Sequence, residues 1–242
     1  MNTSASPLTI VIPARNEAKL LPSLLESLSQ QDYPQMRHTK VFVADAGSTD
    51  GTQELALGFR GRLDVEVIPG GLPSVGRNAG ARKATTPFVL FIDADMELKD
   101  FTLIRRAIEL AERRNLHCVT TNVWCDRGNV GDKLLYFGSN LMQYGSLLCR
   151  PFSTGMFMLF AKARFDQLGG FNEGALYAED YLLSKKVANW KFGVVSGKIN
   201  TTNRRFRNMG RSRIILLFFK TMLNTFNEDY FLHDQGYWRQ KV

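Results

Sequence analysis

The sequence predicts an α/β fold with a single open, mostly parallel and twisted sheet that is covered by helices on both faces. Up to about Val123, short apolar runs alternate with helical patterns, which is typical of βαβ units. The runs at 8–13 and 88–92 are apolar almost throughout, as expected for strands buried on both faces. Because 242 residues suffice for one large core, we expect a single domain over residues 1–242.

Five strands are predicted in the first half of the chain, and the first and fourth are expected to be central. They are Leu8 to Pro13, Lys40 to Asp45, Val65 to Ile68, Phe88 to Ile92 and Cys118 to Val123. After residue 123 the pattern changes. Residues 131–148 and 179–190 are typical of helices, and residues 155–161 are typical of a further buried strand.

Four helices are expected between the first five strands. The first begins near Pro22 and buries a stripe of leucines, and Asp50 with Gln53 resembles a capping box at the start of the second. The third begins at Ser74 and turns a face of small residues toward the sheet, so that its backbone can approach closely. These small residues are Gly76, Gly80 and Ala84, and the buried face of the fourth helix consists of Phe101, Ile104, Ile108 and Ala111.

The composition favours an anionic partner and a reducing compartment. The chain has 31 Lys and Arg against 23 Asp and Glu, a net charge of +8, which suits a nucleotide, a phospholipid surface or a nucleic acid. Its three cysteines form neither an even disulfide framework nor a CxxC pair. The longest apolar run, Ile214 to Phe219, is far shorter than the ~20 residues of a membrane span. We therefore expect a cytoplasmic protein.

Polar clusters follow three of the predicted strands, at the carboxyl ends where open parallel sheets bind their ligands. They are Pro13 to Glu17, Asp45 to Gly51, and Asp93 to Asp95. Because the residue between them turns away, Asp93 and Asp95 can address one hard cation, Mg²⁺ or Mn²⁺, whose other positions take diphosphate oxygens and water. The plain alternative is a pair of solvated or helix-capping acids. Two acids at the end of a fully apolar strand, however, need a counter-charge.

Two further candidates have equally plain alternatives. The Asp45 carboxylate could accept the imide N–H of a uracil or guanine base, or it could close an Asx turn with Gly47 and Ser48. Arg77 lies in the first turn of the third helix, where it could reach a base or a diphosphate, or it could be a surface arginine.

With these clusters in place, the chain resembles the inverting family 2 glycosyltransferases, whose fold is called GT-A. The similarity covers about residues 8–200 in the right order. The matching segments are TIVIPARNEAKLLPSLLESL at 9–28, VADAGSTDGT at 43–52, GRNAGARKA at 76–84, FIDADMEL at 91–98, GGFNE at 169–173 and YAEDYLLSKK at 177–186.

The resemblance implies an inverting transfer of a sugar from a nucleoside-diphosphate sugar, of the UDP or GDP type, to an acceptor hydroxyl. The product would belong to a cell-envelope polysaccharide, a glycolipid or a related glycan. Residues 8–123 would form a Rossmann-like half that binds the nucleotide sugar, and residues 124–200 an acceptor and catalytic half. The implied donor contacts are Pro13, Ala14, Arg15, Glu17, Asp45, Gly47, Arg77, Asp93, Ala94 and Asp95, with Asp93 and Asp95 on the metal.

Asp180 resembles the family's catalytic base, and Glu179 ranks second, as a residue that orients Asp180 or binds an acceptor hydroxyl. The spacing of Asp180 to Leu183 and Val187 keeps it near the buried stripe of a helix, at the N-terminal turn. Partial burial would raise its pKa, whereas the helix dipole favours the ionised form. The plain alternative is ordinary charge in the first turn of a helix.

Thr154 and Gly155 belong to a segment that is similar to the acceptor side of the family, although a turn of small residues is the alternative. Residues 201–242 form a basic, amphipathic tail, in which Arg204 and Arg205 are candidate acceptor or diphosphate contacts. Arginines beside the apolar run at 214–219 suit a phospholipid headgroup layer, which would place the protein at the inner face of the membrane. The alternative is a helix packed on the domain with solvated arginines.

Two other classes of protein stay open. A sugar-phosphate nucleotidyltransferase uses a related sheet and a metal, but it usually has a glycine-rich first loop, and residues 13–17 contain no glycine. A non-catalytic binding or scaffold subunit would keep the fold, although the presence of Asp93, Asp95 and Asp180 argues against loss of activity. Nucleic-acid binding is not expected, because the arginines gather in one tail without a recognised motif.

Overall fold

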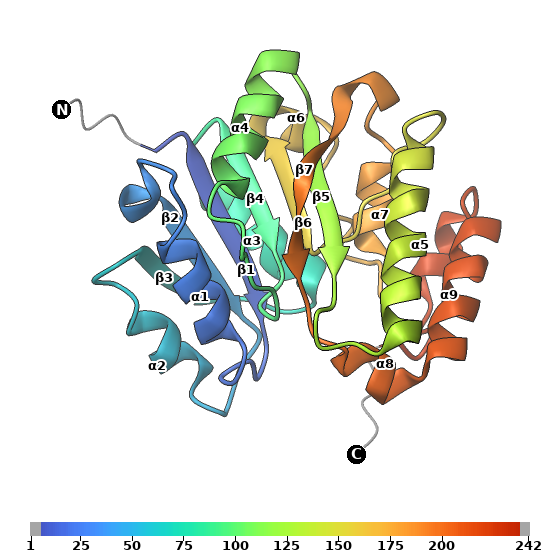
Figure 1. The fold of residues 1–242 in the computed structure, drawn as a ribbon, viewed down its shortest axis with the longest axis horizontal. Coiled ribbons are helices and arrows are strands. Elements are labelled where there is room, and N and C mark those ends of the chain that lie inside the picture. The colour runs from blue at the N-terminus through green and yellow to red at the C-terminus, as the bar shows by residue number, and fades with distance from the viewer. Residues whose placement is uncertain (1–5, 238–242) are drawn as a thin grey trace.

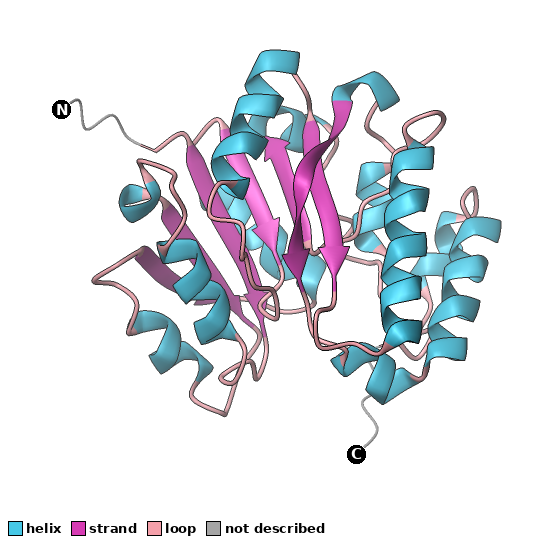
Figure 2. Cartoon of the chain, in the orientation of Figure 1, coloured by secondary structure: helices cyan, strands magenta, loops and turns pink. Residues whose placement is uncertain are grey.

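The computed structural model of the chain describes residues 6–237 and contains one open sheet with helices on both faces, as predicted (Figures 1 and 2). In these residues the sheet has seven strands in the order β3-β2-β1-β4-β6-β5-β7. The strands are β1 (Leu8–Ala14), β2 (Lys40–Asp45), β3 (Asp64–Pro69), β4 (Phe88–Ile92), β5 (Cys118–Trp124), β6 (Phe157–Ala161) and β7 (Phe192–Asn200). The prediction that the first and fourth strands are central is confirmed.

Helices connect the strands along the described part of the chain. The α-helices are α1 (Leu21–Ser29), α2 (Thr52–Leu57), α3 (Pro73–Lys83), α4 (Leu103–Arg114), α5 (Val130–Ser146), α6 (Lys162–Gln167), α7 (Glu179–Ser184), α8 (Arg204–Met209) and α9 (Arg211–Leu223). Short 3-10 helices are η1 (Met36–His38), η2 (Asn189–Lys191) and η3 (Glu228–Leu232).

The sheet is mostly parallel, as predicted, with one antiparallel strand inside it. β1 pairs in parallel with β2 and β4, and so do β2 with β3 and β5 with β7. β6 runs antiparallel to both β4 and β5 and separates them. The fifth predicted strand, β5, therefore pairs with β6 and β7 of the second half of the chain, although its sequence pattern grouped it with the first half.

Two apolar clusters fill the space on either side of the sheet. In Figure 1, α1, α2 and α4 lie in front of the sheet and α3 lies behind it. The front cluster joins strand residues Ile10, Ile12 and Leu90 with Leu25 of α1 and Ile108 of α4. The rear cluster joins Val11 and Phe91 with Ala81 of α3, Phe165 of α6 and Leu183 of α7. Because both faces are covered, the strands are apolar almost throughout.

We predicted that three small residues let the backbone of α3 approach the sheet closely. This is confirmed for Gly76 and Gly80. A Cβ on Gly80 would clash with the side chain of Val11, and one on Gly76 would lie 3.1 Å from the Cβ of Ala44. Ala84, the third, lies outside the helix as its C-cap. The close approach matters because α3 carries Arg77 between these two glycines.

The predicted capping box at Asp50 and Gln53 is wrong. Gly51 is the N-cap of α2 with a φ of 88°, a left-handed conformation that glycine adopts without strain. This turn directs the Asp50 carboxylate to the N–H of Thr52, at 3.1 Å. Gln53 instead donates to the Asp45 carboxylate at 2.7 Å.

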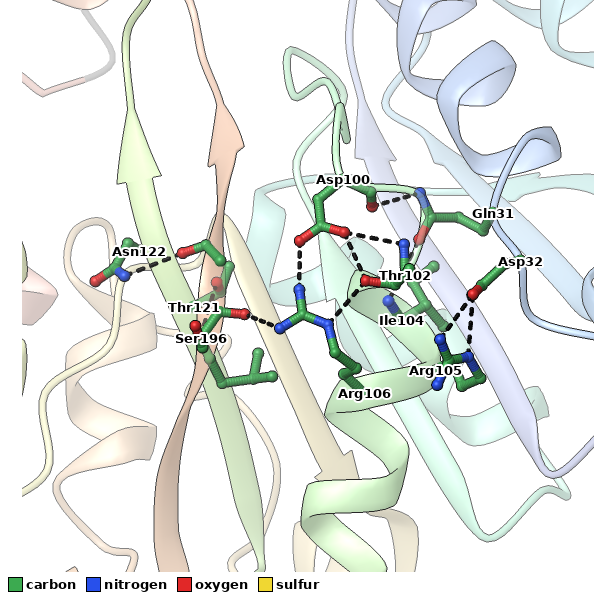
Figure 3. Close-up of polar contacts among 12 residues, drawn as sticks. Gln31, Asp32, Asp100, Thr102, Ile104, Arg105, Arg106, Thr121, Asn122 and Ser196 are labelled. Atoms are coloured by element: carbon green, nitrogen blue, oxygen red, sulfur yellow. Dashed lines mark hydrogen bonds and ion pairs between the residues drawn. The ribbon is translucent and has the colours of Figure 1, made fainter.

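The loop between β4 and α4 is held by polar contacts that reach two other parts of the fold (Figure 3). The Asp100 carboxylate forms an ion pair with Arg106, which also donates to the carbonyl of Ser196 at 2.6 Å. Gln31 donates to the carbonyl of Asp100 at 3.1 Å. Phe101 is left exposed, and α4 begins only at Leu103, so the prediction that Phe101 belongs to the buried face is wrong.

The last predicted helix is shorter than expected, and a strand follows it. α7 ends at Ser184, whose hydroxyl donates back to the carbonyl of Tyr181 at 3.2 Å, a contact that competes with helix propagation. The sequence did not predict β7, in which a bulge near Gly197, with a φ of 126°, shifts the register and breaks the alternating pattern.

Within residues 6–237, no helix combines the length and the apolarity that a membrane span requires. The three cysteines are free in the described residues, with Cys118 and Cys125 buried and Cys149 exposed. Residues 1–5 and 238–242 of the predicted domain and tail lie outside the described residues.

Candidate active site

The loops that follow β1 and β2 are hydrogen-bonded to each other at the carboxyl end of the sheet. The backbone N–H of Asn16 donates to the Ser48 hydroxyl at 2.8 Å, and the Asn16 side chain accepts from the N–H of Thr49 at 2.9 Å. Asn16 has a φ of 54°, so the chain turns sharply after β1. Of the predicted donor contacts, Pro13 and Ala14 end β1, and Arg15 and Glu17 flank Asn16 in the loop that we call the rim of the candidate site.

Asp45, at the end of β2, is buried and closes its own loop. Its carboxylate accepts from the N–H groups of Gly47 at 3.1 Å and Ser48 at 2.9 Å, and from the Ser48 hydroxyl. Gly47 has a φ of 74°, which the turn requires. The Asx turn that was the alternative for Asp45 is thus present, and its contact with a base stays a prediction.

Asp93 and Asp95 follow the fully buried strand β4, as predicted, and flank the buried Ala94. The turn is closed by a hydrogen bond of 3.2 Å from the N–H of Met96 to the carbonyl of Asp93. The two acidic side chains are 22% and 21% exposed. Burial, followed by the charge of Asp93, raises the pKa of Asp95 to about 6. The two acids therefore lie close together, and nearby positive charges do not fully neutralise the Asp95 carboxylate.

Arg77 is almost completely buried, with only 3% of its side chain exposed, so it is no surface arginine. Its Nη2 lies 2.6 Å from Oδ1 of Asp93, and its Nη1 lies 2.5 Å from Oε1 of Glu179. Burial alone would lower the pKa of the guanidinium, but the charges of Asp93 and Glu179 raise it overall. One arginine thus joins the acidic turn after β4 to the first turn of α7. Its contact with a base or a diphosphate stays a prediction.

Asp180 is held by backbone hydrogen bonds beside this ion pair. Its Oδ2 accepts from the N–H of Gly155 at 2.5 Å, and its Oδ1 accepts from the N–H of Tyr181 at 2.8 Å. Burial, followed by the charge of Glu179, raises the pKa of Asp180 to about 6, although Arg77 and these hydrogen bonds oppose the shift. An acid with a pKa near 6 is ionised at neutral pH and can still accept a proton from a reacting hydroxyl.

Gly155 leaves the space that Arg77 and Asp180 need. A Cβ on Gly155 would lie 2.6 Å from Nη2 of Arg77 and 3.3 Å from Oδ2 of Asp180. The neighbouring hydroxyl of Thr154 is buried and has no hydrogen-bond partner among the residues that the structure describes. An orphaned buried hydroxyl next to a candidate base is a group that a bound substrate can satisfy.

Arg204 of α8 reaches the rim of the site from the tail. It forms two hydrogen bonds to the Glu17 carboxylate, of 2.6 and 2.9 Å, and lies 3.5 Å from Oδ2 of Asp95. Arg205 instead stacks on the ring of Tyr237, with 4.7 Å from its Cζ to the ring centroid. The contact between Glu17 and Arg204 was not predicted from the sequence, because 187 positions separate the two residues.

The acidic turn after β4 suits a hard divalent cation. Carboxylate oxygens are its preferred ligands, and a cation would offset the repulsion that raises the pKa of Asp95. In the part of the chain that the structure describes, no cluster of three or more His, Cys, Asp or Glu side chains is placed to hold a metal. For a cation at this turn, the chain would supply two carboxylates, and further ligands would come from a substrate and from water.

The model of the family described as Glycosyl transferase family 2 matches residues 9–167, about two thirds of the chain. The chain belongs to glycosyltransferase family 2. The matched part runs from β1 to the end of α6 and includes Asp45, Arg77, Asp93 and Asp95. It ends before α7, so the position of Asp180 rests on the geometry described above.

Curated relatives of this family 2 member match part of its length. The poly(ribitol-phosphate) beta-N-acetylglucosaminyltransferase TarS of Staphylococcus aureus is 33% identical over 99 residues, which is 39% of this chain and 17% of TarS. The 4,4'-diaponeurosporenoate glycosyltransferase of Staphylococcus haemolyticus is 34% identical over 112 residues, which is 44% of this chain and 29% of that enzyme. The chain therefore spans less than a third of the length of these relatives.

Solved structures of other glycosyltransferases share the GT-A fold predicted from the sequence. The mannosyltransferase PcManGT of Pyrobaculum calidifontis, in complex with GDP-Man and Mn²⁺, aligns with a TM-score of 0.69 at 20% identity, over 92% of this chain and 65% of that one. TarS 1–349 of S. aureus in complex with UDP-GlcNAc aligns with a TM-score of 0.61 at 20% identity, over 79% of this chain and 58% of that one.

Proposed function

We propose that the chain is an inverting glycosyltransferase that moves a sugar from a nucleoside-diphosphate sugar, of the UDP or GDP type, to an acceptor hydroxyl. The observation that carries the proposal is the contact of one buried arginine with two motifs. Arg77 binds Asp93 of the acidic turn and Glu179, the neighbour of Asp180. A candidate leaving-group site and the turn that carries a candidate base are thereby held by one side chain.

The donor class is supported by the relatives. The aligned structures of TarS and PcManGT contain UDP-GlcNAc and GDP-Man. We assign the nucleotide to the joined loops after β1 and β2, where Arg15 is exposed and Gly47 leaves room for a close approach of the backbone. The Asp45 carboxylate already accepts hydrogen bonds from its own loop, which hold it in place. Its remaining lone pairs would accept a hydrogen bond from the nucleotide base.

We assign a divalent cation, Mg²⁺ or Mn²⁺, to Asp93 and Asp95. Their hard oxygens and the raised pKa of Asp95 support this assignment, as does the Mn²⁺ in the structure of PcManGT. When bound, the cation would neutralise charge on the diphosphate leaving group. Arg77 keeps one oxygen of Asp93 in place. Arg204 lies beside Asp95 and Glu17, and we assign its guanidinium to an arriving phosphate.

Asp180 is the proposed base. Its carboxylate takes the proton from the acceptor hydroxyl while the oxygen forms a bond to the anomeric carbon, and the bond from that carbon to the diphosphate oxygen breaks on the opposite face. The electron pair leaves with the nucleoside diphosphate, and the configuration of the anomeric carbon inverts. The N–H of Gly155 donates to the Asp180 carboxylate and holds it in place. Glu179 binds Arg77, so its proposed role is to position Asp180.

On the acceptor side, we assign Thr154 and Gly155 to the substrate, because the Thr154 hydroxyl is buried without a partner in residues 6–237. The acceptor would be a sugar or a lipid-linked sugar of a cell-envelope polysaccharide, a glycolipid or a related glycan. The basic tail at 201–242 is proposed to contact the membrane at its cytoplasmic face, where such an acceptor would be presented.

A donor screen tests the proposed function. The purified chain is incubated with Mn²⁺ and UDP-, GDP- or dTDP-sugars, and the melting temperature and the released nucleotide are measured. We expect one donor to raise the melting temperature and to be hydrolysed slowly to the nucleoside diphosphate. Release of pyrophosphate would instead indicate a nucleotidyltransferase, and no response to any donor would contradict the proposal. Asp180→Asn should keep donor binding and lose transfer.

A further inference from the structure

Helix α5 leaves a complete apolar stripe exposed. Its side chains recur every three or four residues and are 43% to 87% exposed, which is unusual for a helix that also packs on a sheet. They are Val130, Leu134, Phe137, Leu141, Tyr144 and Leu148. The opposite side of the helix is buried against β5, with Tyr136 and Gln143 facing the domain. The hydroxyl of Tyr144 accepts a hydrogen bond from Asn122 of β5 at 3.3 Å, and the other side chains of the stripe are left largely exposed.

Helix α9 and the residues after it show a second exposed apolar stripe. Its inner side is anchored, since Leu217 and Thr221 are buried and both contact the hydroxyl of Tyr177. Its outer side chains are 38% to 83% exposed. They are Ile215, Leu216, Phe219, Met222, Leu223 and Phe226. The packed-helix alternative considered for the tail thus accounts for one side of α9 and leaves the other unexplained.

The two helices lie side by side at one edge of the molecule (Figure 1). At their first turns, Nε of Arg211 lies 2.8 Å from Oδ1 of Asp132. Just beyond their last turns, the guanidinium of Arg150 lies 4.5 Å from the ring centroid of Phe226. These contacts at both ends make α5 and α9 parallel neighbours. The two helices lie on the side of the molecule away from β1, β2 and β3, and we call their two exposed stripes together the α5/α9 surface.

Basic residues outnumber acidic ones around the α5/α9 surface, where Asp132 of α5 pairs with Arg211 and where Glu228 and Asp229 follow Phe226. Residues 203–226 contain no Asp or Glu, and their six basic residues are Arg204, Arg205, Arg207, Arg211, Arg213 and Lys220. Arg150 adds a further positive charge where the two helices end. Two copies of this surface placed face to face would bring like charges together, whereas an anionic headgroup layer would neutralise them.

We propose that the α5/α9 surface binds the anionic face of a lipid bilayer, with both helices lying in the plane of the interface. Apolar bulk beside arginines fits the boundary between acyl chains and headgroups. No helix in the described residues is long and apolar enough to span the bilayer, so the contact would be interfacial. The proposal rests on the tail contact proposed above and adds α5, which is about 70 positions earlier in the chain, as its other half.

The same surface connects directly to the candidate active site. Helix α8 immediately precedes α9 and contributes Arg204, which contacts Glu17 and Asp95. Phe206 of α8 packs on Tyr136, on the inner side of α5. A lipid-linked acceptor held at the α5/α9 surface would therefore lie next to the donor rim.

The test is flotation of the full-length chain with vesicles of phosphatidylcholine, alone or with about 30% phosphatidylglycerol. We expect binding to the anionic vesicles that weakens with added salt. The double variants Leu134→Gln with Leu141→Gln on α5, and Phe219→Gln with Leu223→Gln on α9, should each lower the partition coefficient at least tenfold. The control Leu55→Gln with Phe101→Gln changes exposed apolar residues elsewhere and should bind as the wild type does.

Circular dichroism and the melting temperature establish that each variant is folded. Wild-type binding by the α5 variant would remove α5 from the surface and overturn the proposal. So would equal binding to neutral and anionic vesicles, or a dimer in solution that the α5 variant abolishes while no vesicle binds. Donor hydrolysis is measured on the same samples without vesicles, so that loss of membrane binding and loss of the proposed reaction are seen separately.

Discussion

Arg77 and Glu179 form a buried ion pair, 2.5 Å from Nη1 to Oε1, that ties α3 to the first turn of α7. The second guanidinium nitrogen of Arg77 binds Asp93, so the acidic turn after β4 is fixed to the same point. Hydrogen bonds to a shared planar cation constrain both position and orientation of the two carboxylates. The relative placement of the proposed leaving-group site and the proposed base thus depends on Arg77.

Replacing Arg77 by Met should destabilise the fold strongly, because two carboxylates with little solvent access lose their counter-charge. We expect the free energy of unfolding to fall by about 3 kcal/mol, measured by urea denaturation at neutral pH. Adding Glu179→Gln to this variant should recover part of the loss, since one of the two uncompensated charges is removed. Arg82→Met, which affects an exposed arginine of the same helix, should change stability by less than about 1 kcal/mol. Equal effects of the two arginine variants would contradict the role of Arg77.

Gly155→Ala should reduce transfer without unfolding the protein. The added methyl group needs space now occupied by Arg77 and Asp180, so the base and its positioning arginine must shift. We expect kcat to fall at least tenfold, since displacements of this size at a reacting centre are known to be costly. Gly138→Ala is the matched control, because a Cβ there meets no atom within 4 Å and alanine favours the helix. An active Gly155→Ala variant would show that this close approach is dispensable.

The rate of transfer should depend on the ionisation of Asp180. Its pKa is raised to about 6, mainly by burial, so Asp180 is protonated below this pH. Protonation would remove the proposed base. We therefore expect kcat/KM to fall as the pH drops from 7 to 5 and to be constant above about pH 7. A profile without change across this range would contradict the assignment of Asp180.

Asp95→Asn should stabilise the protein near pH 8 when cations are chelated. Because the folded-state pKa of Asp95 is raised, its stabilising contribution is complete below the unfolded-state pKa and is lost as the pH rises through 6. Asparagine removes the charge that the fold disfavours, so we expect a gain of about 1–2 kcal/mol near pH 8 and a smaller one near pH 5. Urea denaturation at both pH values measures the difference. A loss of stability near pH 8 would contradict the raised pKa.

Much of the structure of residues 8–123 could be predicted from the sequence, because the signals there are local. The apolar runs of β1 and β4 gave the central strands, and Asp93 and Asp95 were expected at the end of β4. The second half depends on long-range packing. The bulge at Gly197 interrupts the alternating pattern of β7, and the insertion of β6 between β4 and β5 left no mark in the order of residues.

The contacts within the candidate site were harder to predict than its members. Arg77, Glu179 and Asp180 were each named from the sequence, but their pairing was not, because it joins residues about 100 positions apart. Motif spacing reports only neighbours along the chain. The contact of Arg204 with Glu17 was missed for the same reason, because the two residues are far apart along the chain.

The most direct test of the account is calorimetric titration of UDP and GDP into the wild type and Asp95→Asn, with and without Mn²⁺. If Asp93 and Asp95 hold a cation against the diphosphate, Mn²⁺ should raise the affinity of the wild type for one nucleotide at least tenfold and leave that of Asp95→Asn unchanged. Nucleotide binding that is equally strong without Mn²⁺, or that Mn²⁺ strengthens equally in both proteins, would contradict it.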